Sequence, residues 1–155
     1  MKDERELLNK LTKRTIEYIS KDLAMNEVEE TFEIANEESL QLLDISTQIK
    51  LSGYMEGSIV LSISNTLAIE LAKNSIFGEL EESLLQELAG ENTAEILNIV
   101  LGNVLMQLEG VKDGKSLEIS APKTTQNSYV IKKEKELLFS VLNYKNENII
   151  LGYFR

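Results

Sequence analysis

The sequence predicts an α+β fold, an antiparallel sheet with helices packed on one of its faces. Three observations predict it. Apolar residues recur at helical spacing in some segments and alternate at strand spacing in others. Short links rich in Gly or Asn join neighbouring strand-like runs, and these runs are grouped apart from the helical segments. The length of 155 residues fits a single domain spanning residues 1–155.

The first half of the chain begins with a helix. Leucine and isoleucine recur at helical spacing over residues 3–24. A strand or loop is expected near residues 31–34. Residues 44–53 alternate apolar and polar side chains, and residues 57–63 form a second β-rich run. The short glycine-flanked link between these two runs predicts a hairpin.

Two further helices are expected in the middle of the chain. Ser-Asn-Thr at residues 64–66 is a typical helix start, and it predicts a helix over about residues 65–77 that stops near Gly78. Residues 81–109 form the longest helical pattern in the sequence. Gly90 is expected to break or kink this helix.

The last third of the chain is expected to be strands. Residues 117–126 predict a strand interrupted at Pro122, and residues 137–144 and 148–154 predict a hairpin joined by an Asn-containing turn. The two final runs are strongly apolar, and such strands at an open sheet edge promote aggregation unless they are covered. Pairing with a second copy of the chain would cover them, so a homodimer is expected.

Composition excludes several kinds of chemistry. The chain has no histidine, no cysteine, no tryptophan and one proline. Disulfides, a thiolate nucleophile, a zinc ribbon, a Ser-His-Asp triad and histidine metal ligands are therefore absent. No metal site of its own is expected, and any catalysis has to use carboxylates, amides, hydroxyls, lysines or a borrowed metal.

The charge of the chain is strongly acidic and unevenly spread. The net charge is −10, and residues 51–110 hold 9 acidic side chains against one basic side chain. This balance argues against binding nucleic acid or an anionic membrane surface. The acidic middle is either a solvated face or a surface that meets a basic partner. No apolar run of membrane-spanning length and no secretory signal are present, so a cytoplasmic location is expected.

One helix has a polar face that needs an explanation. On a helical wheel at about 100° per residue, four residues of the 91–108 segment share an arc of about 60° opposite the apolar face. They are Glu91, Glu95, Asn98 and Gly102. A glycine inside a helix costs about 1 kcal/mol relative to alanine, so Gly102 either leaves room for an approaching partner or packs closely on a neighbouring element. Met106 lies near the same arc, either as an apolar contact beside the site or in core or dimer packing.

The pair Glu95 and Asn98 is informative only through its context. Glu-x-x-Asn occurs three times in the chain, close to the frequency expected by chance. Around residue 95, however, the segment reads TAEILNIVLGN, and Ser-Ala-Pro follows at residues 120–122. This context resembles the signature of the CheC/CheX/FliY chemotaxis phosphatases, in which a helical Glu-x-x-Asn precedes an apolar pair, a glycine and a more distant proline.

The resemblance assigns roles residue by residue. Glu95 and Asn98 match the catalytic pair of the family, Gly102 matches its glycine, and Pro122 matches its proline. The chain departs from the pattern at Glu91, where the family usually has Asp or Ser. Only one complete motif is present, which places the chain nearest CheX. The resemblance implies a CheX-like fold and a dimer joined through the sheet.

The mechanism is also implied by the resemblance. The family acts on the phosphorylated response regulator CheY, whose active site holds an aspartyl phosphate and Mg²⁺. Asn98 would orient a water for in-line attack on phosphorus, and Glu95 would pair with a lysine of the partner. Four other residues would contact the partner, namely Glu91, Gly102, Pro122 and Met106. Such a phosphatase needs no cofactor of its own, since phosphoryl transfer depends mainly on positioning and charge stabilisation.

Two other functions remain open from the sequence. The same fold could act as a non-catalytic adaptor that docks a receiver domain or a flagellar switch component. A plain dimeric structural domain is the other possibility. The intact Glu95/Asn98 pair favours the phosphatase, since an adaptor has no need of a water-orienting amide beside the glutamate.

Overall fold

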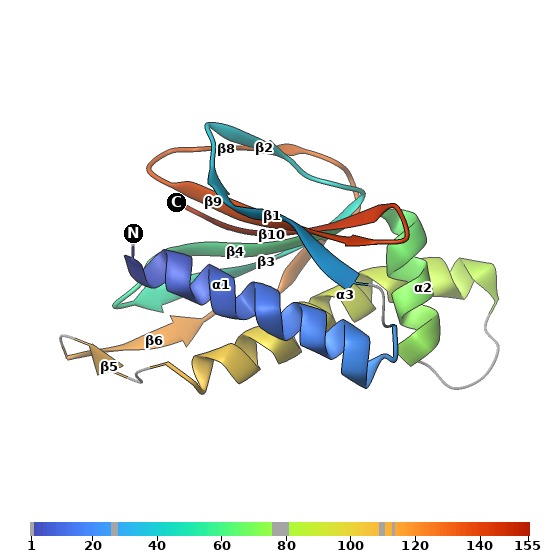
Figure 1. Cartoon of the computed structure of the whole chain (residues 1–155), viewed down its shortest axis with the longest axis horizontal. Coiled ribbons are helices and arrows are strands. Elements are labelled where there is room, and N and C mark those ends of the chain that lie inside the picture. Colours follow the sequence, from blue (N-terminus) through green and yellow to red (C-terminus); the bar gives the residue numbers. More distant parts are fainter. Residues whose placement is uncertain (1, 26–27, 76–80, 109–110, 113) are drawn as a thin grey trace.

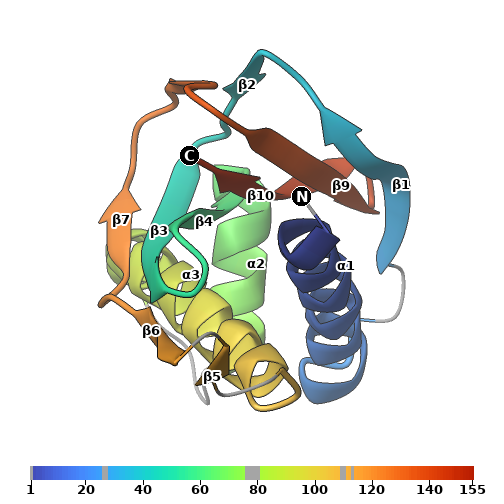
Figure 2. The same cartoon turned by 90° about the vertical axis from the view of Figure 1, so that its left-hand side faces the viewer.

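A curved antiparallel sheet carries the described α-helices on one of its faces (Figure 1). The structure is a computed structural model that describes residues 2–25, 28–75, 81–108, 111–112 and 114–155. The sheet curls around the helices, with β1 on one side of them and β7 on the other (Figure 2). The predicted fold class, α+β with helices on an antiparallel sheet, is confirmed.

The helices and strands have the following bounds. The helical elements are α1 (Lys2–Glu17), its π-helical continuation η1 (Tyr18–Asp22), α2 (Asn65–Ser75) and α3 (Glu82–Leu105). The main sheet contains β1 (Val28–Asn36), β3 (Ile45–Gly53), β4 (Gly57–Ile63), β5 (Val111–Lys112), β6 (Lys115–Ile119), β7 (Lys123–Thr125), β9 (Leu137–Tyr144) and β10 (Glu147–Phe154). Its strand order is β1-β9-β10-β4-β3-β6-β5, with β7 also paired to β3. A separate ribbon pairs β2 (Ser39–Gln41) with β8 (Val130–Lys132).

Both predicted hairpins are present. Strands β3 and β4 pair from Leu51 opposite Gly57 onward, and β9 pairs with β10 along its whole length. The turn of the second hairpin places Lys145 and Asn146 at positive φ, at 45° and 68°. Two such residues give the twist that a tight hairpin needs. The predicted interruption at Pro122 separates β6 from β7, and the predicted stop of α2 near Gly78 falls outside the described residues.

The expected break at Gly90 is wrong, because α3 is continuous from Glu82 to Leu105. A Cβ added at Gly90 would lie 2.6 Å from Nε2 of Gln126 and 3.6 Å from Cγ2 of Thr124. The glycine therefore lets the helix lie close to β7 and the residues that follow it. Its role is close packing of the helix against this part of the sheet.

The open-edge position expected for the terminal hairpin is also wrong. Strand β1 pairs with the outer side of β9, and β4 pairs with β10, so the hairpin lies inside the sheet. The weakly patterned segment before β2 supplies this covering strand, whose register with β9 shifts twice. The apolar composition of the hairpin is explained by burial on both faces, not by exposure at an edge.

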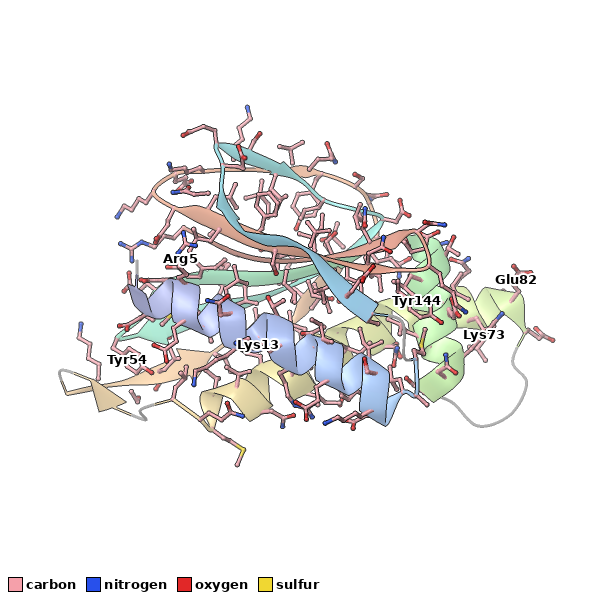
Figure 3. All side chains as sticks on the ribbon, viewed as in Figure 1. Arg5, Lys13, Tyr54, Lys73, Glu82 and Tyr144 are labelled. Carbon is pink, nitrogen blue, oxygen red and sulfur yellow. The ribbon has the colours of Figure 1, made fainter. Side chains whose placement is uncertain are left out.

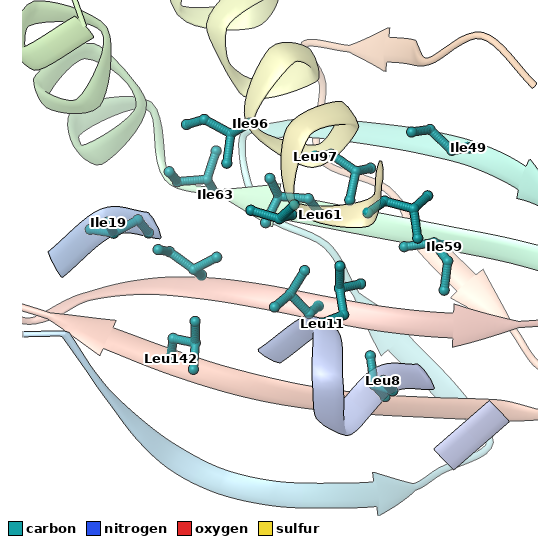
Figure 4. Close-up of a cluster of buried hydrophobic side chains, with 14 of the residues drawn as sticks. Leu8, Leu11, Ile19, Ile49, Ile59, Leu61, Ile63, Ile96, Leu97 and Leu142 are labelled. Carbon is teal, nitrogen blue, oxygen red and sulfur yellow. The ribbon is translucent and has the colours of Figure 1, made fainter. Parts of the chain in front are cut away.

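The main core lies between the sheet and the helices (Figure 4). Leu8 and Leu11 of α1 and Leu97 of α3 meet Leu61 and Leu142 from the strands, and all five are buried. The opposite face of the sheet has a smaller apolar cluster beneath the β2–β8 ribbon. Sequence analysis missed this ribbon, since its two strands have only three residues each. Of the helices that the structure describes, none is long and apolar enough to cross a membrane.

Candidate functional site

Helix α3 is held in place by its buried face. The residues of this face that are fully or almost fully buried include Ile96, Leu97, Val100, Leu101 and Val104. The hydroxyl of Thr93 is buried and donates a hydrogen bond to the carbonyl of Ala89 at 2.7 Å. With one face fixed against the sheet, the orientation of the opposite face is fixed as well.

The opposite face is the candidate site, and we call it the α3 stripe: Glu91, Glu95, Asn98, Gly102 and Met106. These residues follow one another at spacings of three or four, so a continuous helix puts them on one face. Glu91, Glu95, Asn98 and Met106 are exposed, and Gly102 is partly exposed. Five of the six residues predicted from the sequence are therefore brought together by the structure.

The polar groups of the α3 stripe have no partners within the described chain. No side chain there makes an ion pair with Glu91 or Glu95 or a hydrogen bond with the amide of Asn98. Helix α3 carries four glutamates and no lysine or arginine. Its exposed carboxylates are thus free to bind a cation that another molecule presents.

Gly102 faces open space. An added Cβ there would meet no described heavy atom within 4 Å. Close packing against a neighbouring element, one of the two explanations left open by the sequence, is therefore wrong. The side chain of Met106 is 85% exposed, so core packing is likewise wrong for this residue.

Helix α1 borders the α3 stripe and contributes a cation that is already engaged. Nε of Arg14 donates a hydrogen bond to Oδ1 of Asn103 at 2.9 Å. A second guanidinium nitrogen of Arg14 lies 3.5 Å from a carboxylate oxygen of Asp22, and the group stands 5.9 Å from the ring centre of Tyr18. Arg14 therefore links α1 to the residue next to Gly102.

Tyr18 is influenced by this arginine and by Glu95 of the α3 stripe. Partial burial raises the pKa of the Tyr18 hydroxyl, and the negative charges of Asp22 and Glu95 raise it further, while Arg14 acts in the opposite direction. The hydroxyl is therefore neutral at physiological pH. The sequence does not predict roles for Arg14, Tyr18 and Asn103, because no local pattern joins residues of α1 to residues of α3 so far along the chain.

Pro122 is the sixth residue predicted for the site, and it lies outside helix α3. It is exposed in the link between β6 and β7, and the preceding Ser120 is bonded to the backbone of Lys50 on β3. Strand β7 meets α3 at the buried Gly90. Pro122 thus stands directly before the strand that packs against α3.

The chemistry available to the α3 stripe is limited and specific. It presents a neutral amide at Asn98 and an anionic carboxylate at Glu95, one turn apart. Within the part of the chain that the structure describes, no group of three or more acidic side chains could hold a metal ion. Such a site can orient a polar molecule through the amide and bind a cation through the carboxylate.

Comparison with known proteins agrees with this arrangement. The family model described as chemotaxis phosphatase CheX matches residues 45–143. Among solved structures, the CheX–CheY–BeF3–Mg²⁺ complex from Borrelia burgdorferi matches with a TM-score of 0.74 at 18% identity, over 94% of this chain and 95% of that chain. CheX from Desulfovibrio desulfuricans matches with a TM-score of 0.73 at 13% identity, over 97% and 99% of the two chains. No curated protein matches the chain in sequence.

Proposed function

Because the chain belongs to the CheX family of chemotaxis phosphatases, we propose that it hydrolyses the aspartyl phosphate of a CheY-type response regulator. The observation that carries the proposal is the unpaired amide and carboxylate of Asn98 and Glu95, exposed together on α3. The matched segment, residues 45–143, includes both residues. A solved relative bound to CheY, BeF3 and Mg²⁺ supports a receiver domain as the partner.

Asn98 is the proposed water-orienting residue. Its amide enters the partner's active site and holds a water in line with the phosphorus–oxygen bond to the partner's aspartate. The water oxygen forms a bond to phosphorus, the bond to the aspartyl oxygen breaks, and the products are inorganic phosphate and the free carboxylate. A neutral amide suits this role, since a carboxylate at the same place would repel the phosphoryl oxygens. Mg²⁺ bound by the partner would neutralise the charge on those oxygens.

Glu95 is the proposed anchor. It lies one turn before Asn98, about 4.5 Å along the helix axis, so it can pair with a lysine of the partner without approaching the phosphoryl group. Glu91 adds a second negative charge on the same face, and Gly102 leaves the surface after Asn98 free of a side chain. Pro122, exposed in the link before β7, is proposed as a further contact with the partner.

We also propose that the protein is a cytoplasmic homodimer joined through its sheet. The terminal hairpin is enclosed by β1 and β4, so an outer strand such as β1 is the proposed contact. Light scattering coupled to size-exclusion chromatography measures this directly. A monomer at micromolar concentration would contradict it.

The decisive experiment follows the decay of a phosphorylated CheY-type receiver domain with wild type and Asn98→Ala. Wild type should accelerate the decay, and Asn98→Ala should abolish the acceleration with little loss of thermal stability, since Asn98 is exposed. Gln86→Ala is the matched control, an exposed amide on the same helix away from the α3 stripe, and it should behave as wild type. Equal decay with wild type and Asn98→Ala would contradict catalysis and favour the adaptor.

A further inference from the structure

The two ends of helix α3 differ in charge. All four glutamates of the helix lie in residues 82–95, and Glu82 marks the end remote from the β5–β6 hairpin (Figure 3). Residues 96–108 contain no charged side chain. Asn98 stands at the boundary between this acidic half and this uncharged half. A partner that lies along the helix therefore meets charge at one end and, at the other, an uncharged surface from which Met106 projects.

Met106 is the dominant apolar group of the uncharged half. Its side chain is 85% exposed, whereas the other exposed large hydrophobic residues in the described chain are between 38% and 47% exposed. Its backbone N–H still bonds to the carbonyl of Gly102 at 3.3 Å, so the residue is held in the last turn of the helix. The side chain thus projects into solvent from an ordered position.

A single exposed apolar residue is ordinary, so the position of Met106 matters more than its exposure. It lies on the same face as Asn98, eight residues further on, which is about 12 Å along the helix axis. Between the two lies Gly102, where an added Cβ would meet nothing within 4 Å. A partner in contact with Asn98 therefore meets no side chain at Gly102 before it reaches Met106.

We propose that Met106 is an apolar anchor for the receiver domain that binds the α3 stripe, and that it sets the direction in which this partner lies along α3. This inference rests on the proposed function. The partner that occupies this face follows from continuity with Asn98 and from charge. The acidic half favours a basic surface on the partner, and Met106 favours an apolar contact beyond the phosphoryl group. The partner should then carry an apolar depression about 12 Å from its phosphoryl group. Methionine suits such a contact because its flexible thioether adapts to irregular apolar surfaces.

The kinetic signature of an anchor differs from that of a catalytic residue. Met106 is too far from the reacting atoms to affect the chemical step. Its loss should therefore raise KM and leave kcat unchanged, the pattern expected when uniform binding is removed. The effect of an apolar contact should also persist at high salt, whereas the attraction of the acidic half should weaken.

The test compares Met106→Ala, Met106→Leu and Gln107→Ala, with a phosphorylated CheY-type receiver domain as substrate. Met106→Ala should raise KM about tenfold with unchanged kcat, and Met106→Leu should recover most of the loss. Gln107→Ala is the matched control, an exposed neighbour off the α3 stripe, and it should stay near wild type. A KM for Met106→Ala within about twofold of wild type, with Asn98→Ala inactive, would overturn the anchor and leave the proposed function intact.

Two further measurements test the role of Met106 independently of phosphatase activity. If Asn98→Ala were as active as wild type, the proposed function itself would fail, and binding of a beryllofluoride-loaded receiver domain would then test Met106 alone. Unchanged affinity of Met106→Ala in that assay would overturn the anchor. If Met106→Glu turned a wild-type dimer into a monomer, Met106 would belong to a contact between two copies, which would also overturn it.

Discussion

Helix α3 contains two glycines, one in each half, and they serve opposite purposes. Gly90 is buried, and an added Cβ there would lie 2.6 Å from the side chain of Gln126. Gly102 faces open space, with no described atom within 4 Å of an added Cβ. The first glycine lets the helix approach its own sheet, and the second leaves room outside the molecule. A glycine in this helix therefore indicates close packing at Gly90 and an open surface at Gly102.

The two halves differ in chemistry as well as in packing. The first half carries all the negative charge of α3, while the second carries Asn98, an open position and Met106. The second half is also bonded to α1 through Arg14 and Asn103. In the proposed function, charge selection and water positioning belong to neighbouring turns of one helix. This separation can be tested by changing one half at a time.

The largest expected effect comes from filling each glycine with a leucine. Gly102→Leu should retain the fold but reduce phosphatase activity about 100-fold or more, because a bulky side chain displaces the partner from Asn98. Gly90→Leu should instead destabilise the fold by about 1–3 kcal/mol through overpacking against β7. Activity and thermal melting of both variants measure the contrast. Full activity of Gly102→Leu would remove the argument that this position is kept clear.

The next effect concerns the acidic half. Glu95→Gln should weaken binding of the receiver domain about tenfold at low salt, since it removes the proposed partner of a cation. The difference from wild type should shrink at high salt, because exposed charges are screened. Titration at two ionic strengths measures this, with Glu6→Gln on α1 as a control at an exposed position. A loss that is independent of salt would assign Glu95 a role other than charge pairing.

A smaller effect is expected from alanine at the two glycines. Gly102→Ala should stabilise the protein by up to about 1 kcal/mol, because alanine is the better helix former and its Cβ meets open space. The melting temperature should rise by about 2–4 °C. Gly90→Ala should gain less, since the side chain of Gln126 has to move away first. Equal gains in both variants would mean that the two sites are not packed differently.

The smallest effect is a change in the titration of Tyr18. Burial first, and then the charges of Asp22 and Glu95, raise the pKa of this hydroxyl. Glu95→Gln removes one of these charges, so the pKa of Tyr18 should fall, and tyrosinate should form at a lower pH in an ultraviolet titration. Asn98→Ala changes no charge and is the control. A pKa that stays the same in Glu95→Gln would separate Tyr18 from the α3 stripe.

Much of this architecture was predictable from local patterns. Helical spacing predicted α1 and α3, alternation predicted β3, and short links predicted both hairpins. The same helical periodicity placed Glu95, Asn98, Gly102 and Met106 on one face, because positions three or four apart in a continuous helix must share a face. Recognition of the family motif then suggested what that face does.

Other features depended on contacts between distant segments. The position of the terminal hairpin inside the sheet is set by β1, whose own sequence is weakly patterned. The role of each glycine depends on which atoms surround it. Gly90 is packed against Gln126, a residue 36 positions further along the chain. The link from Arg14 to Asn103 is likewise beyond any local signal.

The amino-acid pattern alone thus established the fold class, the exclusion of histidine and cysteine chemistry, and one helix face with an amide beside a carboxylate. Only the tertiary structure decided that this face is unpaired, that Gly102 is clear and Gly90 filled, and that Met106 is free in solvent. The physical reason is that periodicity is a property of neighbouring residues, whereas burial and exposure are created when remote segments pack together.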